Sequence, residues 1–174
     1  ASSNKQSLSA DLKRPEFERA RLGLVDWADV VHHNMRPGAA ERLSLGWEQV
    51  SARNPRAIYL YAPGWGSSGP DRDRQSFAPM MSGYVGACLE VAGQFNEPTF
   101  PLGNEDPGNG LMGAVAMAMA LLEREVSGKG QYIENPQLDA AMAHLSHVVR
   151  RPDGETLNAM RLDPLQFGFR AFER

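Results

Sequence analysis

The sequence predicts an α/β fold, a parallel Rossmann-like βαβ sheet, on three observations. Short runs rich in branched and aromatic residues at 29–33 and 57–62 are typical of buried strands. The segments around them carry apolar residues at helical spacing. A long apolar run from Leu111 to Leu122 precedes a further strand candidate at 131–134. Strands that alternate with helices at these intervals favour parallel pairing.

The first half of the chain is expected to contain three strands and three helices. Pro15 opens the first helix, because proline is tolerated in a first turn. Phe17, Ala20, Leu24 and Trp27 then recur at helical spacing. In order, the expected elements are a strand over 7–12, a helix over 16–27, a strand over 29–33, helices over 39–43 and 47–53, and a strand over 57–62.

The second half is expected to be irregular until its long helix begins. Glycine and proline dominate residues 63–70, and the charge run over 71–74 is expected to be solvated. The further expected elements are a helix over 77–91, a loop over 95–109, a buried helix from Leu111, a strand over 131–134 and a helix over 136–149.

Composition and charge are those of an ordinary globular domain. The 174 residues are 42% hydrophobic and 22% charged with net charge −3, which indicates neither a nucleic-acid-binding nor a membrane-surface protein. No apolar run reaches the roughly 20 residues that cross a bilayer, and the polar start is unlike a signal peptide. A single cysteine, Cys88, excludes an internal disulfide and fits a reduced, cytoplasmic setting. Eleven Lys and Arg residues lie in 1–74 and two in 75–149, so an anionic ligand is expected to bind the first half.

Asp106 is the first candidate for chemistry. It stands beside Glu105 in a glycine-rich turn, just ahead of the long apolar helix. Free backbone N–H groups and the positive end of a helix dipole favour an ionised carboxylate there. Two interpretations remain open from the spacing: Asp106 or Asn109 is a helix N-cap, or Asp106 is a nucleophile held on the turn.

The segment over residues 106–131 resembles the class III CoA-transferases. It reads D-x-x-x-G, an alanine-rich apolar helix, Glu-Arg-Glu and then S-G-K-G-Q. N-M-R-P-G at 34–38, N-P-R at 54–56 and G-x-G-x-x-G-P at 64–70 are similar to further blocks of this family, which includes formyl-CoA and carnitine CoA-transferases and alpha-methylacyl-CoA racemases. The resemblance covers residues 4–149. It implies an incomplete copy of the family's parallel sheet and Asp106 as the catalytic residue.

The same resemblance implies a coenzyme A site in the first half. S-A-D-L-K at 9–13 is similar to the family's L-D-L-K element. By position, the residues that line the family's CoA site fall on Ala10, Lys13, Asn34, Met35 and Arg42. Lysine and arginine suit the phosphates of CoA, and methionine suits adenine or the pantetheine arm. Lys13 and Arg42 are expected just after successive strands, at the edge of a parallel sheet where ligands bind.

Other motifs are interpreted as structural. G-x-G-x-x-G at 64–69 follows a strand, but Pro70 and a charge run stand where a dinucleotide site requires a helix. His144 and His147 lie one turn apart without a third ligand, so no metal is expected. His32 and His33 are expected to be satisfied or surface residues. Asp139, in L-D-A-A, is expected to mark a helix start.

Histidine usage favours a transferase over a racemase. Racemisation next to a thioester requires an acid and a base on opposite faces of the carbon. In the family's racemases the partner of the aspartate is a histidine in the region that corresponds to 71–78, where this chain has DRDRQSFA. We therefore expect an enzyme that moves CoA from an acyl-CoA to a small carboxylic acid through an aspartyl intermediate.

Two alternatives stay open beside this expectation. One is a CoA-dependent racemase, and the other is a non-catalytic CoA-binding or dimerisation module that keeps Lys13, Asn34 and Arg42 without using Asp106. The resemblance also implies an interlinked homodimer. Residues 1–150 are expected to be part of a large domain, and 151–174 a linker and the start of a smaller one near Leu165–Phe172.

Overall fold

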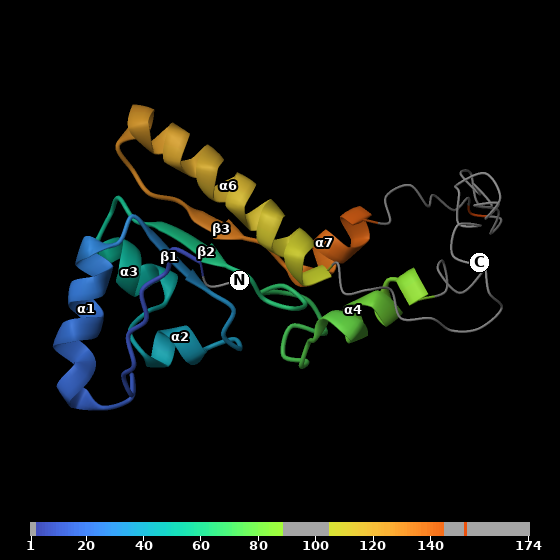
Figure 1. Cartoon of the computed structure of the whole chain (residues 1–174), viewed down its shortest axis with the longest axis horizontal. Coiled ribbons are helices and arrows are strands. Elements are labelled where there is room, and N and C mark those ends of the chain that lie inside the picture. The colour runs from blue at the N-terminus through green and yellow to red at the C-terminus, as the bar shows by residue number, and fades with distance from the viewer. Residues whose placement is uncertain (1–2, 89–104, 145–151, 153–174) are drawn as a thin grey trace.

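A three-stranded parallel sheet lies at the centre of the molecule (Figure 1). The structure, a computed structural model, describes residues 3–88, 105–144 and 152. The strand order is β1-β2-β3, and the register pairs Val30 with Ile58 and Tyr59 with Tyr132. The strands are β1 Val30–His33, β2 Ile58–Tyr61 and β3 Tyr132–Glu134. The predicted α/β class with parallel pairing is confirmed.

Helices cover both faces of this sheet. Helix α6 runs along one side, while α1, α2 and α3 lie on the other, and α4 and α7 lie beyond the carboxyl ends of β2 and β3 (Figure 1). The helices are the 3-10 helix η1 Pro15–Phe17, α1 Glu18–Trp27, α2 Ala39–Arg42, α3 Trp47–Arg53, α4 Ala78–Tyr84, α6 Glu105–Ser127 and α7 Gln137–His144.

Strand β2 is buried along its whole length, so it is the centre of both packing layers. Tyr59 and Tyr61 point to one face, where they join Val25 of α1 and Val50 of α3 in a hydrophobic cluster. Leu60 points to the other face and touches α6: a Cβ on Gly113 would lie 3.2 Å from its Cδ2. Because side chains alternate along a strand, β2 thus packs against a helix layer on each side.

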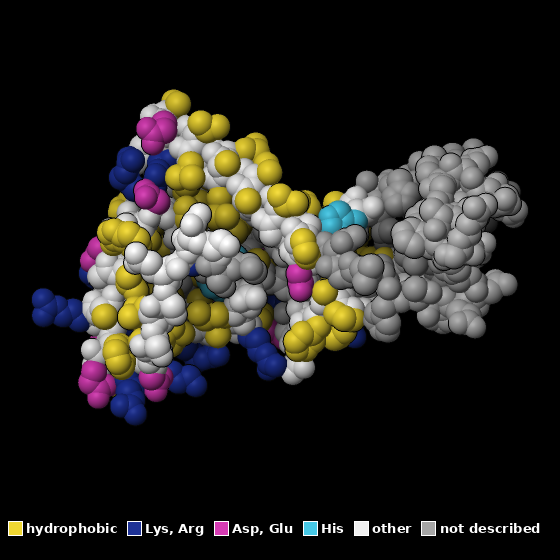
Figure 2. Space-filling view, viewed as in Figure 1, with side chains coloured by type: hydrophobic (Ala, Val, Ile, Leu, Met, Phe, Trp, Pro, Cys, Tyr) yellow, Lys and Arg dark blue, Asp and Glu magenta, His cyan; other side chains and the backbone are white. Residues whose placement is uncertain are grey.

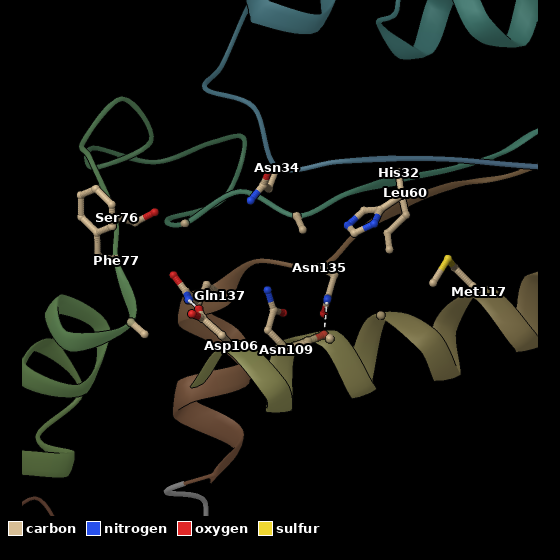
Figure 3. A pocket seen from close by; sticks show the side chains of 15 residues that line it. His32, Asn34, Leu60, Ser76, Phe77, Asp106, Asn109, Met117, Asn135 and Gln137 are labelled. Atoms are coloured by element: carbon tan, nitrogen blue, oxygen red, sulfur yellow. Dashed lines mark hydrogen bonds between the residues drawn. The ribbon is translucent and has the colours of Figure 1, made fainter. Parts of the chain in front are cut away.

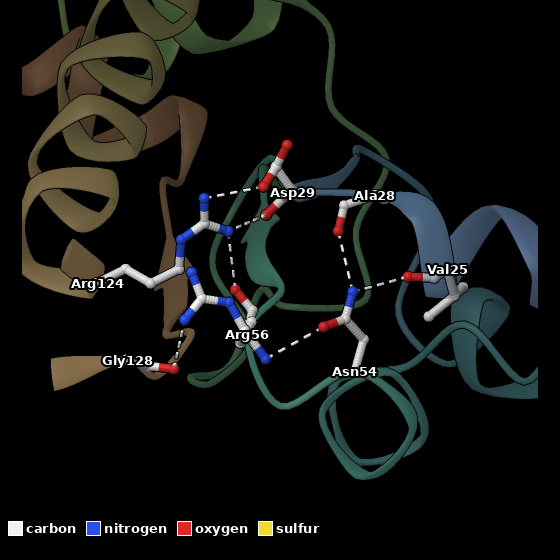
Figure 4. Close-up of polar contacts among 7 residues, drawn as sticks. All are labelled: Val25, Ala28, Asp29, Asn54, Arg56, Arg124 and Gly128. Atoms are coloured by element: carbon white, nitrogen blue, oxygen red, sulfur yellow. Dashed lines mark hydrogen bonds and ion pairs between the residues drawn. The ribbon is translucent and has the colours of Figure 1, made fainter.

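The amino-terminal edge of the sheet is tied to the last turns of α6 (Figure 4). The buried Arg124 guanidinium donates to Asp29 Oδ1 at 2.8 Å and to the carbonyl of Arg56 at 3.1 Å. Arg56 in turn donates to the carbonyl of Gly128 at 3.2 Å. Asn54 donates to the carbonyls of Val25 and Ala28, at the end of α1. The N-P-R block therefore joins α1, β2 and α6.

Three predicted elements differ from the structure. Residues 7–12 form no strand: they are largely exposed and pair with no strand in the described part of the chain. The helix expected over 77–91 is α4, which ends at Tyr84, and Gly86 follows at φ +87°. The loop expected over 95–109 is wrong for residues 105–109, which form the first turn of α6. Pro107 fits there, because a first-turn N–H has no intrahelical acceptor.

The expected burial of α6 is also wrong for this chain. Its apolar residues fall on two faces, and only one of them packs on the sheet. The outward face carries Leu111, Val115, Met119, Leu122 and Val126, at 58–91% exposure, here called the α6 stripe (Figure 2). No helix among the described residues has the length and apolar character needed to span a membrane.

Several expectations concern residues outside the described ranges. These are the end of the predicted helix over 77–91, the loop over 95–104, the end of the last helix with His147, and the segment 151–174 apart from Pro152, including the predicted domain start at Leu165–Phe172.

Candidate functional site

A cavity of about 420 Å³ opens at the carboxyl end of the sheet (Figure 3). Its walls come from four places: the end of β1, the connection after β2, the first turns of α6, and the connection from β3 to α7. The polar residues that line it include His32, Asn34, Ser76, Asp106, Asn109 and Gln137. Leu60, Phe77 and Met117 contribute apolar surface. A parallel sheet is expected to bind ligands at this edge.

Asp106 lies in the first turn of α6 and lines the cavity. The first four N–H groups of a helix have no partner within the helix, and the dipole is positive there, so an ionised carboxylate is favoured. Gln137 Nε2 donates to Asp106 Oδ1. Of the two open interpretations, one made Asp106 or Asn109 an N-cap and the other held Asp106 on a turn ahead of the helix. A simple N-cap would not need to lie on a cavity wall, as Asp106 does.

Glu105, the competing carboxylate, points elsewhere. It is 5% exposed and accepts a hydrogen bond from the Ser82 hydroxyl of α4. It does not line the cavity. Consecutive residues of a helix face different directions, so one of the two carboxylates joins α6 to α4 and the other faces the open space.

Two amides support the cavity wall. Asn135 Nδ2 donates to the carbonyl of Asn109 at 2.8 Å, and its side chain lies against Gly113. The side-chain oxygen of Asn109 is buried and has no hydrogen-bond partner among the described residues. Asn109 itself lines the cavity, whereas this oxygen is an acceptor closed off from solvent.

The two neighbouring histidines of β1 point to opposite faces of the sheet. His32 lines the cavity that contains Asp106, and partial burial lowers its pKa, which favours the neutral imidazole. His33 lies on the other face, where its Nε2 is 2.6 Å from Tyr59 Oη and its Nδ1 accepts the N–H of Met35. Burial lowers the pKa of His33 too, against an opposing effect of the Glu41 charge. His33 is thus satisfied, as expected, whereas His32 is available to the cavity.

The residues predicted to line a CoA site are only partly brought together. Asn34 lines the cavity with Asp106, and Met35 is half-buried beside it. Arg42 lies on α2, and its Nη1 is 3.1 Å from where a Cβ of Gly38 would be. Lys13 is exposed and Ala10 half-buried, and neither lines this cavity. Lys13 follows no strand, so the expected placement of Lys13 and Arg42 after successive strands is wrong for Lys13.

The glycine-rich turn at 64–69 acts as a connection. Gly66 and Gly69 have φ of +96° and +92°, and no helix begins before α4. A Cβ on Gly64 would lie 1.8 Å from Ser76 Oγ, so this glycine allows Ser76 to reach the cavity wall. Arg74 stacks over Trp65 at 4.8 Å, which folds the charge run back on the turn.

Within residues 3–88 and 105–144, no three His, Cys, Asp or Glu side chains gather where they could hold a metal ion. His144, which was considered as a metal ligand with His147, instead packs on the backbone of Gly108 in the first turn of α6.

Sequence reasoning missed His32, Asn109, Asn135 and Gln137. His32 could have been found from the alternation of a strand, since of two consecutive residues one must face each side. The two amides of the β3–α7 connection carry no signal in the sequence, because only the closure of the sheet brings them to α6.

Comparison with known proteins identifies the family. The sequence profile of CoA-transferase family III matches residues 1–159. The chain belongs to CoA-transferase family III. It is 38% identical over 136 residues to the beta subunit of succinyl-CoA–L-malate CoA-transferase from Chloroflexus aurantiacus, which covers 76% of this chain and 33% of the relative. It is 30% identical over 180 residues to succinyl-CoA:mesaconate CoA-transferase from Haloarcula hispanica, covering 97% of this chain and 45% of the relative.

Solved structures of family III agree with the fold. A CAIB/BAIF family protein from Brucella suis superposes with a TM-score of 0.75 at 31% identity, over 81% of this chain and 38% of that protein. The sequence thus spans less than half the length of the relatives it matches. The incomplete family III sheet that the resemblance implied is confirmed.

Proposed function

We propose that the protein containing this chain transfers CoA from an acyl-CoA thioester to a carboxylic acid through a covalent intermediate on Asp106. The observation that carries this proposal is the position of Asp106, in the first turn of α6 and on the wall of a cavity at the carboxyl edge of a parallel sheet. Family III membership supports the reaction class.

The proposed reaction uses the carboxylate as nucleophile. An Asp106 oxygen attacks the thioester carbonyl, the C–S bond breaks, and CoA leaves as a thiolate from a mixed anhydride. The thiolate attacks the aspartyl carbonyl of that anhydride, which releases the donor acid and leaves an aspartyl-CoA thioester. An acceptor carboxylate attacks this thioester and expels the thiolate, which then attacks the acceptor carbonyl and frees Asp106. The covalent intermediates divide one difficult acyl transfer into easier steps.

The first turn of α6 supports the charges that this reaction develops. N–H groups in the first turn of a helix have no acceptor within the helix, so those of α6 can donate to the oxyanion of each tetrahedral intermediate.

Replacement of Asp106 tests the proposal. Asp106→Asn keeps the size of the side chain and is expected to reduce turnover in the full-length protein by several orders of magnitude. It should also abolish a hydroxylamine-sensitive adduct that the parent forms with donor acyl-CoA. Asp139→Asn is the matched control, because Asp139 also lies in a first turn, that of α7, but does not line the cavity. Near-parent turnover of Asp106→Asn would end the proposal.

We further propose that CoA is bound by Ala10, Lys13, Asn34, Met35 and Arg42, of which Asn34 lines the cavity. This proposal is supported by three positions: Asn34 on the cavity wall, Met35 next to it and Arg42 on the following helix. CoA bound along them would have its phosphates near Arg42 and its thioester in the cavity. Affinity should fall as salt rises, since the phosphates are anionic. Unchanged CoA affinity of the full-length protein with Lys13→Ala and Arg42→Ala together would count against it.

A racemase is the second candidate, and His32 is the observation that favours it. His32 lines the same cavity as Asp106, and burial lowers its pKa so that the neutral imidazole can act as a base. Incorporation of deuterium at the α-carbon of a chiral acyl-CoA, lost in His32→Gln, would favour the racemase. Transfer of CoA without such incorporation favours the transferase.

The remaining proposals concern the setting of the enzyme. The proposed donor is an acyl-CoA and the proposed acceptor a small carboxylic acid. This choice is supported by the names of the matched relatives, which contain succinyl-CoA, L-malate and mesaconate. An interlinked homodimer is supported by the exposed α6 stripe, an apolar surface of the kind that associations cover. A reducing, cytoplasmic setting is supported by the single cysteine.

A further inference from the structure

We propose that Gln137 is a positioning residue for Asp106: its amide holds one carboxylate oxygen so that the other faces the cavity as the nucleophile, while Asn135 fixes the helix turn that carries Asp106. This inference rests on the proposed function of Asp106. It concerns Asn135, in the β3–α7 connection, and Gln137, the first residue of α7, and the experiment separates its failure from that of the proposed function.

The contact between Gln137 and Asp106 divides the two carboxylate oxygens. Gln137 Nε2 donates to Oδ1, and no other hydrogen bond to this carboxylate forms within the part of the chain that the structure describes (Figure 3). Oδ2 is therefore free to attack. The amide of Gln137 thus orients the carboxylate of Asp106.

The backbone of Gln137 is itself held firmly. Its N–H donates to the carbonyl of Pro63 at 2.8 Å, and the N–H of Leu138 donates to the carbonyl of Gly64 at 3.0 Å. Just before them, the N–H of Asn135 donates to the carbonyl of Tyr61 at 2.8 Å. These bonds continue the β2–β3 pairing past the end of the sheet, so the amide reaches Asp106 from a fixed point on the central strand.

Asn135 supplies a second contact with the same helix turn. Its Nδ2 donates to the carbonyl of Asn109, and the residue is 9% exposed. Gly113 permits this approach, since a Cβ there would be 3.0 Å from Asn135 Nδ2. Asp106 and Asn109 are about one turn apart, so two contacts at this spacing resist both rotation and sliding of the helix start. A single contact would leave one of these movements free.

Three variants of the full-length protein test the inference. Gln137→Met has similar length and flexibility but no donor. Gln137→Glu places a second carboxylate beside the first. The matched control is Gln131→Met: Gln131 Nε2 also donates from the β3 region to a carboxylate of α6, that of Glu123, but at the far end of the helix. Measurements are kcat, KM for the acyl-CoA, the rate of formation of the hydroxylamine-sensitive adduct, and the melting temperature.

Gln137→Met is expected to lower kcat and adduct formation by about tenfold to a hundredfold, the usual effect of one hydrogen bond to a charged group, with little change in KM. Gln137→Glu should lose at least as much, since its carboxylate donates no hydrogen bond and repels the charge of Asp106. Gln131→Met should match the parent in all four measurements.

Three results would overturn the inference. Gln137→Met that matches the parent, in a protein where Asp106→Asn is inactive, would reject Gln137 while leaving the proposed function intact. A rise in KM as large as the fall in kcat, together with a lowered melting temperature, would show a purely structural contact. An active Asp106→Asn variant would instead reject the proposed function, and the inference with it.

Discussion

The three glycines in the first half of α6 allow one substitution to be compared in three surroundings. Gly108, Gly110 and Gly113 are each to be replaced by alanine. None of them has a positive φ, so the backbone of each accepts a side chain. In a helix interior, alanine is more favourable than glycine by about 0.8–1 kcal/mol of helix stability, and this gain applies to all three positions. Any difference between them must therefore come from what the new Cβ meets.

The surroundings differ sharply. Among the described residues, a Cβ on Gly110 meets nothing within 4 Å, so Gly110→Ala should raise the free energy of unfolding by about 1 kcal/mol. A Cβ on Gly113 lies 3.0 Å from Asn135 Nδ2 and 3.2 Å from Leu60 Cδ2, an overpacking that costs about 1–3 kcal/mol and cancels or exceeds the gain. A Cβ on Gly108 would lie 1.9 Å from the His144 ring, which must turn away.

His144 provides the control that isolates this clash. It is exposed at the end of α7, and its ring is the part that must move. In a His144→Ala background, Gly108→Ala should recover the gain of about 1 kcal/mol, whereas Gly110→Ala should give the same gain in both backgrounds. Gly110 lines the cavity, so its extra methyl should also lower kcat/KM even as the protein becomes more stable.

The assays are urea or thermal unfolding of the full-length protein and turnover with an acyl-CoA donor. The expected order of stability is Gly110→Ala above the parent, with Gly108→Ala and Gly113→Ala at or below it. A destabilising Gly110→Ala, or additive effects of Gly108→Ala and His144→Ala, would refute the packing described for the start of α6.

Further predictions concern stability and association. Arg124→Met should lower the free energy of unfolding in urea by about 2 kcal/mol, because a buried guanidinium loses its bonds to two carbonyls and a carboxylate. Asp29→Asn should lower it by less than about 1 kcal/mol, since the side chain of Asp29 is 77% exposed and its charge is screened; equal costs would contradict this. Burial lowers the pKa of His33, so the unfolded chain binds the proton first as pH falls. Its contribution to stability should be complete above about pH 6.5 and decline below it, and His33→Gln should flatten that decline; an unchanged slope would contradict it. The 174-residue chain alone should self-associate through the α6 stripe, which size-exclusion chromatography would detect and Leu122→Glu should reduce; a monomer that unfolds cooperatively would count against this.

Local patterns predicted most of the regular structure. The α3 helix begins and ends where its apolar spacing indicated, and β1 and β2 differ from prediction only at their ends. The segment 7–12 failed because a strand needs a neighbour, and its alternation of small and apolar residues could not show that none is present in the described part of the chain. The start of α6 was missed because Pro107 and Gly108 suggested a loop, although a first turn tolerates both residues.

The candidate site divides in the same way. Asp106 could be proposed from the sequence because its signals are local: a carboxylate beside glycines ahead of an apolar helix, in a D-x-x-x-G segment that resembles the family. Gln137 and Asn135 were not predicted, because their contacts depend on the pairing of β3 with β2. This pairing brings Gln137 to Asp106, 31 positions earlier in the sequence, and Asn135 to Asn109, 26 positions earlier. Contacts between residues so far apart in the sequence are set by the register of the sheet, which the spacing of residues in the sequence does not reveal.

The glycines of the D-x-x-x-G segment show why a motif and its cause must be separated. Gly108 is accounted for by packing, because a side chain there would overlap the His144 ring. Gly110, the glycine of the motif itself, meets no neighbour in the described part of the chain and costs the helix about 1 kcal/mol relative to alanine. Gly110 has no packing role in the described part of the fold and lies on the wall of the cavity that Asp106 lines. It is therefore better explained by what enters the cavity than by the helix that carries it.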